Sequence, residues 1–142
     1  MTALERITER VMANGNPEDR RVRTPLLTLE EFFDGNDFVG SIGCNLDSEP
    51  APAEFYELLS NMRSAPDVSD IRVQVTCVDD PGNDWPFSDT VWIFTNISPN
   101  EIAARFPSHL APDEVWEGWI PGRSYDECEV REGHRPLAAW WD

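Results

Sequence analysis

The sequence predicts an α+β protein built as a ferredoxin-like β-α-β-β-α-β sandwich, with an N-terminal helical extension and an extra C-terminal strand. Three observations lead to this prediction. The chain has 142 residues with 40% hydrophobic content and six Trp, which is enough for one continuous core. Helix-period and strand-period runs alternate along it, and turn residues separate most of them. We expect residues 1–25 to form a helix and linker and residues 26–142 to form a single domain.

Residues 3–13 place apolar side chains at helical spacing, because Leu4, Ile7 and Val11 occupy positions i, i+3 and i+7. The stretch "NGNPEDRRVRTP" then combines turn residues with an arginine cluster, and it predicts a linker over residues 14–25. The arginines would suit an anionic ligand. A solvated linker is the simpler interpretation of the same cluster.

The motif "TLEE" predicts a helix start, because Thr28 and Glu31 have the spacing of a capping box. The glycine-rich stretch "FDGNDFVGSIGCNL" follows and leads into an apolar run, which predicts a strand around residues 41–46. The stretch "PAEFYELLSNMR" has a clear helical period, and Pro52 suits its first turn.

The second half alternates two strong strands with a short helix. "DIRVQVTCV" alternates apolar and polar side chains, and "TVWIFTN" is rich in strand formers. "SPNEIAARF" predicts a helix in which Ser98 is the N-cap and Glu101 completes a capping box. "EVWEGWI" and the terminal "PLAAWWD" predict two further strands.

The net charge of the chain excludes more classes of function than any motif in it does. Eleven Arg and no Lys stand against 27 acids, which gives a net charge of −16. Residues 1–23 carry +1 and the remainder carries −17. Such a surface repels phosphate backbones and attracts basic proteins, so we expect a basic protein partner and no nucleic acid. No segment resembles a signal peptide or a membrane span, and three unpaired Cys favour a reduced, cytoplasmic protein.

The glycine-rich loop over residues 34–46 is the place where an enzyme or ligand site would lie. It fits neither a calcium loop, a phosphate loop nor a nucleophile elbow. Cys44, Asn45 and Asp37 would line such a site, and His109 and His134 are the only histidines that could activate the thiol. A structural turn, in which glycines permit positive φ or close packing, is the alternative interpretation.

Metal and cofactor sites are not indicated. The densest group of oxygen ligands contains Asp79, Asp80 and Asp84, which are weak metal candidates because their spacing matches no known loop. Asp-Pro-Gly-Asn at this point is also good turn chemistry. We therefore expect no bound cofactor.

The C-terminal third combines tryptophans with acids. In a strand, Trp140 and Trp141 point to opposite faces, so one of them should leave the core unless both faces are covered. Trp116 and Trp119 cannot share a side of a regular strand. Aromatic residues rimmed by carboxylates are typical of an interface for a basic partner. The predicted partner-binding residues are Asp113, Glu114, Trp116, Glu117, Trp119 and Trp140.

The motifs "TLEEFFDGND", "SIGCNL", "WPFSDTV" and "WWD" together resemble a set of small acidic bacterial proteins of unassigned function. In general character the chain is also similar to bacterial immunity proteins, which neutralise basic toxins. The charge of −17 after residue 23, the absence of a catalytic constellation and the acid-rimmed tryptophans predict a non-enzymatic binding module of an immunity or regulatory type. A small enzyme or ligand-binding domain at the 34–46 loop and a nucleic-acid mimic are the alternatives.

Overall fold

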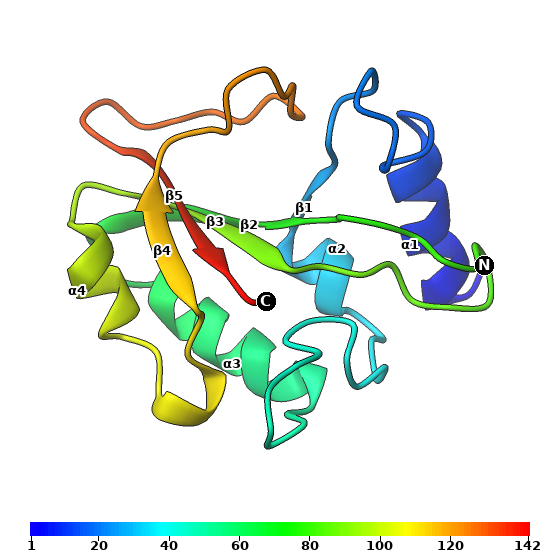
Figure 1. Ribbon diagram of the computed structural model, residues 1–142, viewed down its shortest axis with the longest axis horizontal. Coiled ribbons are helices and arrows are strands. Elements are labelled where there is room, and N and C mark those ends of the chain that lie inside the picture. Colours follow the sequence, from blue (N-terminus) through cyan, green and yellow to red (C-terminus); the bar gives the residue numbers. More distant parts are fainter.

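The computed structural model describes residues 1–142 as a five-stranded sheet with helices packed mainly on one side (Figure 1). The strands follow the order β1-β2-β3-β5-β4, and every neighbouring pair is antiparallel. The strands are β1 (Leu26–Thr28), β2 (Val68–Gln74), β3 (Thr90–Thr95), β4 (Glu114–Glu117) and β5 (Arg135–Trp140). The helices are α1 (Ala3–Met12), α2 (Leu29–Phe33), α3 (Pro52–Arg63), α4 (Pro99–Ala103) and the 3₁₀ turn η1 (Ser108–Leu110).

The α+β class is confirmed, whereas the ferredoxin-like topology is not. A split βαβ sheet needs crossover connections between parallel strands. Only β3, α4 and β4 form such a unit here, with β5 between the two parallel strands, whereas α2 and α3 connect β1 to its immediate antiparallel neighbour β2. The extra C-terminal strand is therefore an inner strand, and β4 lies at the edge.

The prediction of a strand around residues 41–46 is wrong. This segment is a loop, and its only ladder contact is an isolated bridge between Ile42 and Ser88. Ile42 is buried in the core, which explains the apolar signal without a strand. Gly43 has φ +65, and a Cβ there would lie 2.6 Å from the ring of Phe55, so this glycine permits both a turn and close packing.

The capping predictions are largely confirmed. Thr28 accepts from the Glu31 N–H, while the Glu31 carboxylate accepts from the Thr28 N–H, which completes the box at α2. Ser98 accepts from the Glu101 N–H at α4, but the Glu101 carboxylate does not accept from the Ser98 N–H, so the capping box predicted there is incomplete. Each such cap satisfies helix N–H groups that have no partner within the helix. Local hydrogen bonds of this kind explain why the helix starts were readable from the sequence.

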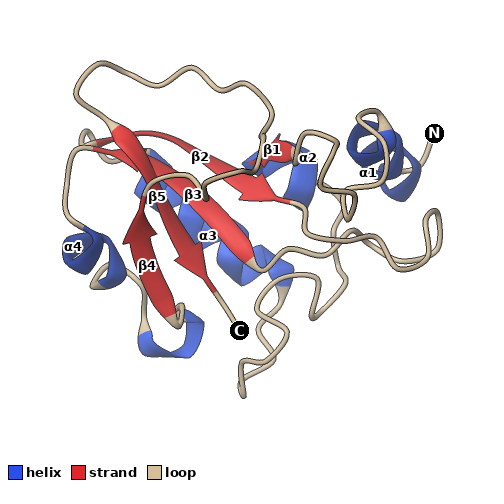
Figure 2. Ribbon diagram, turned by 45° about the horizontal axis from the view of Figure 1, so that its top comes forward, coloured by secondary structure: helices blue, strands red, loops and turns tan.

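The two faces of the sheet bury different side chains. One face carries the large core beneath α2 and α3 (Figure 2), to which β2, β3 and β5 contribute Val73, Ile93 and Leu137. The other face carries a smaller cluster of Leu26, Trp92, Phe94 and Ala138. Residues 118–134 cross this second face, and Tyr125 packs against the smaller cluster.

Helix α1 belongs to the main core, because Ile7 and Val11 are buried within it. The division of the chain at residue 25 stays a prediction. None of the helices combines the length and apolarity that a bilayer crossing requires.

Candidate functional site

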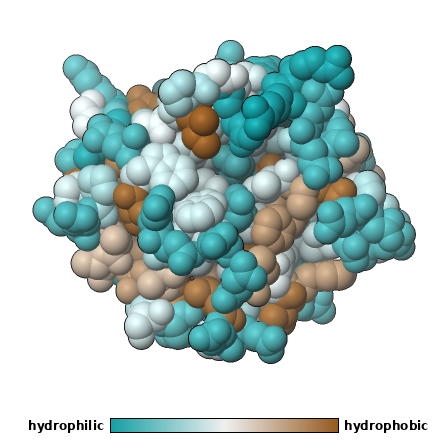
Figure 3. All heavy atoms as spheres, in the orientation of Figure 1, coloured by the Kyte–Doolittle hydropathy of each residue, from teal (hydrophilic) through white to brown (hydrophobic).

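The edge of the sheet at β4 and β5 brings together most of the predicted partner-binding residues. Glu114 lies opposite Trp140 in the register, and Trp116 lies opposite Ala138. Residues that differ by two positions share a face, so Glu114, Trp116 and Trp140 all lie on the second face. Both tryptophans are half-buried, whereas Trp141 points into the main core and is 2% exposed. Pale residues of intermediate hydropathy gather over these strands, and hydrophilic residues surround them (Figure 3).

Carboxylates border these tryptophans without a cation to neutralise them. Asp113 and Glu114 are exposed, and the Asp113 carboxylate accepts from the Asp142 N–H at 2.7 Å. The Asp113 N–H donates to the Trp140 carbonyl at 2.8 Å, which fixes the acidic residue beside the aromatic one. No Arg occurs between residues 106 and 122. We call the group Asp113, Glu114, Trp116, Trp140 and Asp142 the acid–tryptophan surface.

Two predicted residues lie outside this surface. The Arg135 guanidinium donates to Glu117 at 3.1 Å, so that carboxylate already has a cation. Trp119 stacks between Trp92 and Tyr125, with ring centroids 4.5 and 4.7 Å away. The expectation that Trp116 and Trp119 lie on different sides applied to a regular strand, but β4 ends at Glu117 and does not reach Trp119. Gly118 then turns the chain with φ +99, and Trp119 folds back onto the second face.

Asp126 attaches the segment over residues 118–134 to the rest of the molecule. Its carboxylate accepts from Arg10 at 3.0 Å, from Asn14 at 2.7 Å and from the Leu26 N–H at 3.0 Å. Burial alone would raise the pKa of Asp126, but these three donors outweigh it and lower that pKa. These contacts join Asp126 to residues 100 to 116 positions away, and no local pattern in the sequence indicates them.

Most arginines are already neutralised within the fold. Seven of the eleven Arg lie within 4.0 Å of a carboxylate, and these pairs involve eight of the 27 acids. The Arg63 guanidinium, together with Tyr56, holds the pKa of Glu30 at about 2 despite some opposing burial. Nineteen acids remain without an arginine partner. The exposed surface is thus strongly acidic even after internal pairing.

The 34–46 loop does not assemble a thiol site. Cys44 is exposed, while the two histidines are engaged elsewhere: His109 lies 3.7 Å from Glu54, and His134 lies 2.9 Å from the Ser69 hydroxyl. Asn45 donates to the Asp142 carbonyl, which ties the loop to the acid–tryptophan surface instead. Asp37 is exposed and has no side-chain partner.

The other two thiols are poor nucleophiles. Burial, followed by the charge of Asp79, raises the pKa of Cys77 to about 11. Burial also raises the pKa of Cys128. Thiolates are the reactive form of cysteine, so both groups stay protonated and unreactive near neutral pH.

The weak metal candidates do not converge. No three acidic, histidine or cysteine side chains in the structure come together as a metal-binding group. The Asp80 carbonyl accepts from the N–H groups of Asn83 and Asp84, which is the hydrogen bonding of a turn. The structure therefore supports the turn interpretation of this segment.

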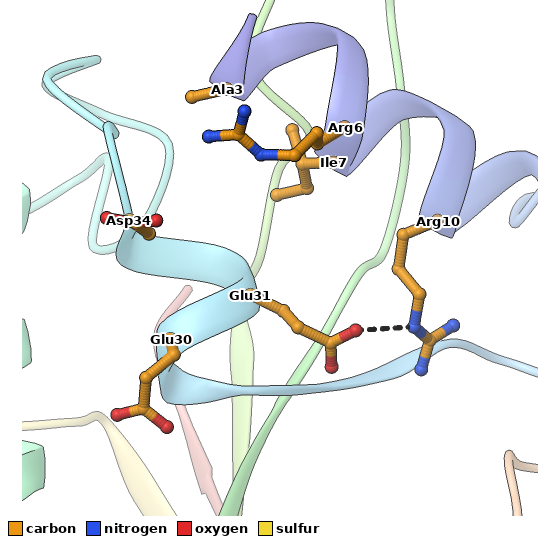
Figure 4. A pocket seen from close by; sticks show the side chains of 7 residues that line it. All are labelled: Ala3, Arg6, Ile7, Arg10, Glu30, Glu31 and Asp34. Carbon is orange, nitrogen blue, oxygen red and sulfur yellow. Dashed lines mark hydrogen bonds and ion pairs between the residues drawn. The ribbon is translucent and has the colours of Figure 1, made fainter. Parts of the chain in front are cut away.

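A pocket of about 330 Å³ lies between α1 and α2 (Figure 4). Helix α1 contributes Arg6 and Arg10, and α2 and its end contribute Glu31 and Asp34. The Arg10–Glu31 ion pair, at 2.9 Å, closes one end of the pocket. Arg6 donates only to the Met1 carbonyl, and Asp34 has no ion-pair partner. Opposite charges therefore face this pocket, which gives it no single preferred ligand charge.

Comparison with known proteins places the chain in a family. Residues 2–139 match the family described as "Uncharacterized protein YfbO family". The chain is 42% identical to "Uncharacterized protein YfbO" of Escherichia coli (strain K12) over 142 residues, and the alignment covers 100% of both proteins. The chain therefore belongs to the YfbO family. This confirms the resemblance to a bacterial protein of unassigned function, whereas the likeness to immunity proteins stays a prediction. No solved structure matches the chain.

Proposed function

We propose that this member of the YfbO family is a non-enzymatic binding module that captures a basic protein partner through its acid–tryptophan surface. The observation that carries the proposal is the position of Trp116 and Trp140. These half-buried aromatic side chains share one face of the sheet with Glu114, and Asp113 and Asp142 adjoin them. Tryptophan is the residue type most enriched among binding hot spots.

The electrostatics support the same kind of partner. No arginine occurs in residues 24–62 or in residues 106–122. The 34–46 loop comes from the first of these segments. The adjoining acid–tryptophan surface comes from the second segment and from the end of the chain. None of the carboxylates of the acid–tryptophan surface has an arginine partner, so a basic protein meets unpaired negative charges there, which accelerate encounter and disfavour acidic competitors. An immunity-type role, in which the partner is a basic toxin, and a regulatory role are both consistent with this chemistry.

The proposal is tested by affinity capture from a lysate of the organism that encodes the protein. Trp116→Ala with Trp140→Ala should remove the captured basic partner, because losing two hot-spot tryptophans costs ~2 kcal/mol or more each. Trp119→Ala is the matched control, because it removes a 36% exposed tryptophan ring that lies outside the acid–tryptophan surface and packs against Trp92 and Tyr125. Equal recovery of the partner by the double variant would refute the assignment of this surface, provided that the variant keeps its native circular dichroism spectrum.

A further inference from the structure

The arginine cluster of the 14–25 linker leaves one guanidinium without an acidic partner. Arg21 pairs with Asp19 at 2.9 Å, and Arg23 lies 3.8 Å from Glu127. Arg20 has no carboxylate within 4.0 Å. The same is true of Arg123, which lies 103 positions later in the 118–134 segment.

These two arginines line the same hollow. It has a volume of about 110 Å³, and Ile120, Pro121 and Gly122 form the rest of its lining, so no carboxylate faces it. A second hollow of about 230 Å³ is also lined by both arginines. Glu18 and Asp19 border this second hollow, and Asp19 is already held by Arg21.

The two segments that carry the arginines are held side by side by backbone hydrogen bonds. The Thr24 N–H donates to the Ser124 carbonyl at 3.0 Å, and the Asp126 N–H donates to the Thr24 carbonyl at 3.0 Å. A parallel bridge joins Thr24 to Tyr125. The arginines are therefore brought together by the fold itself rather than by flexible side chains alone.

Two like charges at one hollow repel each other, and none of the chain's 27 acids lies within 4.0 Å of either guanidinium group to neutralise it. Guanidinium groups bind carboxylates and phosphates through paired N–H donors, so an anion between them would relieve the repulsion. We propose that Arg20 and Arg123 form a binding site for the oxyanion group, carboxylate or phosphate, of a small ligand. Ile120, which is 41% exposed, gives the site an apolar border. The site is independent of the acid–tryptophan surface and of the function proposed for it.

Calorimetric titration of the full chain with inorganic phosphate and with acetate, at constant ionic strength, tests the proposal. We expect saturable binding of at least one anion, weakened 10-fold or more by Arg20→Gln or Arg123→Gln and abolished by both together. Arg131→Gln is the matched control, because Arg131 lies on the same segment, is exposed and also lacks an ion-pair partner. Preference for phosphate over acetate would identify a phosphoryl ligand, and the reverse would identify a carboxylate.

The proposal is wrong if neither anion shows saturable binding to the intact protein. It is also wrong if Arg131→Gln weakens binding as much as the two site variants do, since that result indicates a general charge effect. Native circular dichroism spectra of all four variants separate loss of the site from loss of the fold. The substituted side chains Arg20 and Arg131 are exposed, so these variants should fold normally.

Discussion

Asp126 is the single residue on which the attachment of the 118–134 segment depends most. Replacing it with Ala removes the acceptor for Arg10, Asn14 and the Leu26 N–H. Leaving partly buried donors unpaired should lower the free energy of unfolding by ~2 kcal/mol at pH 7. Chemical denaturation measures this loss. Asp37→Ala, which removes an exposed acid with no side-chain partner, is the control and should change little.

The same residue predicts a dependence on pH. The pKa of Asp126 is lower in the folded protein than its ordinary value of 3.8. Its stabilising contribution is therefore complete above about pH 4 and is lost as the pH falls through the lower folded pKa. The stability difference between the wild type and Asp126→Ala should shrink only in this acidic range. A difference that stays constant down to pH 2 would contradict the role of the ionised carboxylate.

The three cysteines should differ in reactivity. Cys44 is exposed, whereas Cys77 has a pKa of about 11 and Cys128 has a pKa raised by burial. At pH 8 roughly one Cys77 thiol in a thousand is ionised, and only the thiolate attacks a disulfide reagent. Titration with Ellman's reagent should show one fast thiol in the folded protein and three in urea. Cys44→Ala should remove the fast phase, and persistence of that phase would contradict this assignment.

At the scale of elements, Gly118 determines how the chain leaves β4. Its φ of +99 is strained for any residue with a Cβ, although no neighbouring atom lies within 4 Å of that position. Gly118→Ala should therefore destabilise the protein by ~1–2 kcal/mol through backbone strain alone. Trp119 should also lose its place on Trp92, which a red shift in tryptophan fluorescence would report. Unchanged stability together with unchanged emission would contradict this account of the turn.

Elements with local signals were predictable, and those that depend on distant partners were not. The Thr28 capping box and the helix that begins at Pro52 were readable because each start depends on residues a few positions apart. Ile42 misled the prediction, since burial of a loop side chain and burial of a strand side chain give the same apolar signal. The strand order depends on pairings between β3 and β5 that no periodicity encodes.

The candidate site likewise has some features that the local sequence predicts and others that depend on distant residues. The alternation that separates Trp140 from Trp141 is a local property of a strand, so the half-buried and buried positions followed from the sequence. The stacking of Trp119 depends on a glycine turn and on Tyr125, and the neutralisation of Glu117 depends on Arg135, 18 positions away. The contact between Arg10 and Asp126 spans 116 positions and has no counterpart in any local pattern.

At the scale of the whole molecule, charge should limit stability. Nineteen carboxylates have no arginine within 4.0 Å, and their mutual repulsion opposes the compact state. Salt screens this repulsion over a Debye length of about 8 Å at physiological ionic strength. The melting temperature should therefore rise between 10 and 300 mM sodium chloride. A fall over this range would mean that the internal ion pairs outweigh the repulsion.

The measurement that tests the central proposal most directly is the association rate of the captured partner with two charge-matched variants. The first variant combines Asp113→Asn with Glu114→Gln, and the second combines Asp79→Asn with Asp84→Asn. Each variant loses two exposed acids, so the two have the same net charge. We expect the first pair to slow association and to flatten its dependence on salt, and the second pair to behave like the wild type. Equal rates for the two variants at every salt concentration would show that overall charge attracts the partner, and the acid–tryptophan surface would lose its assigned role.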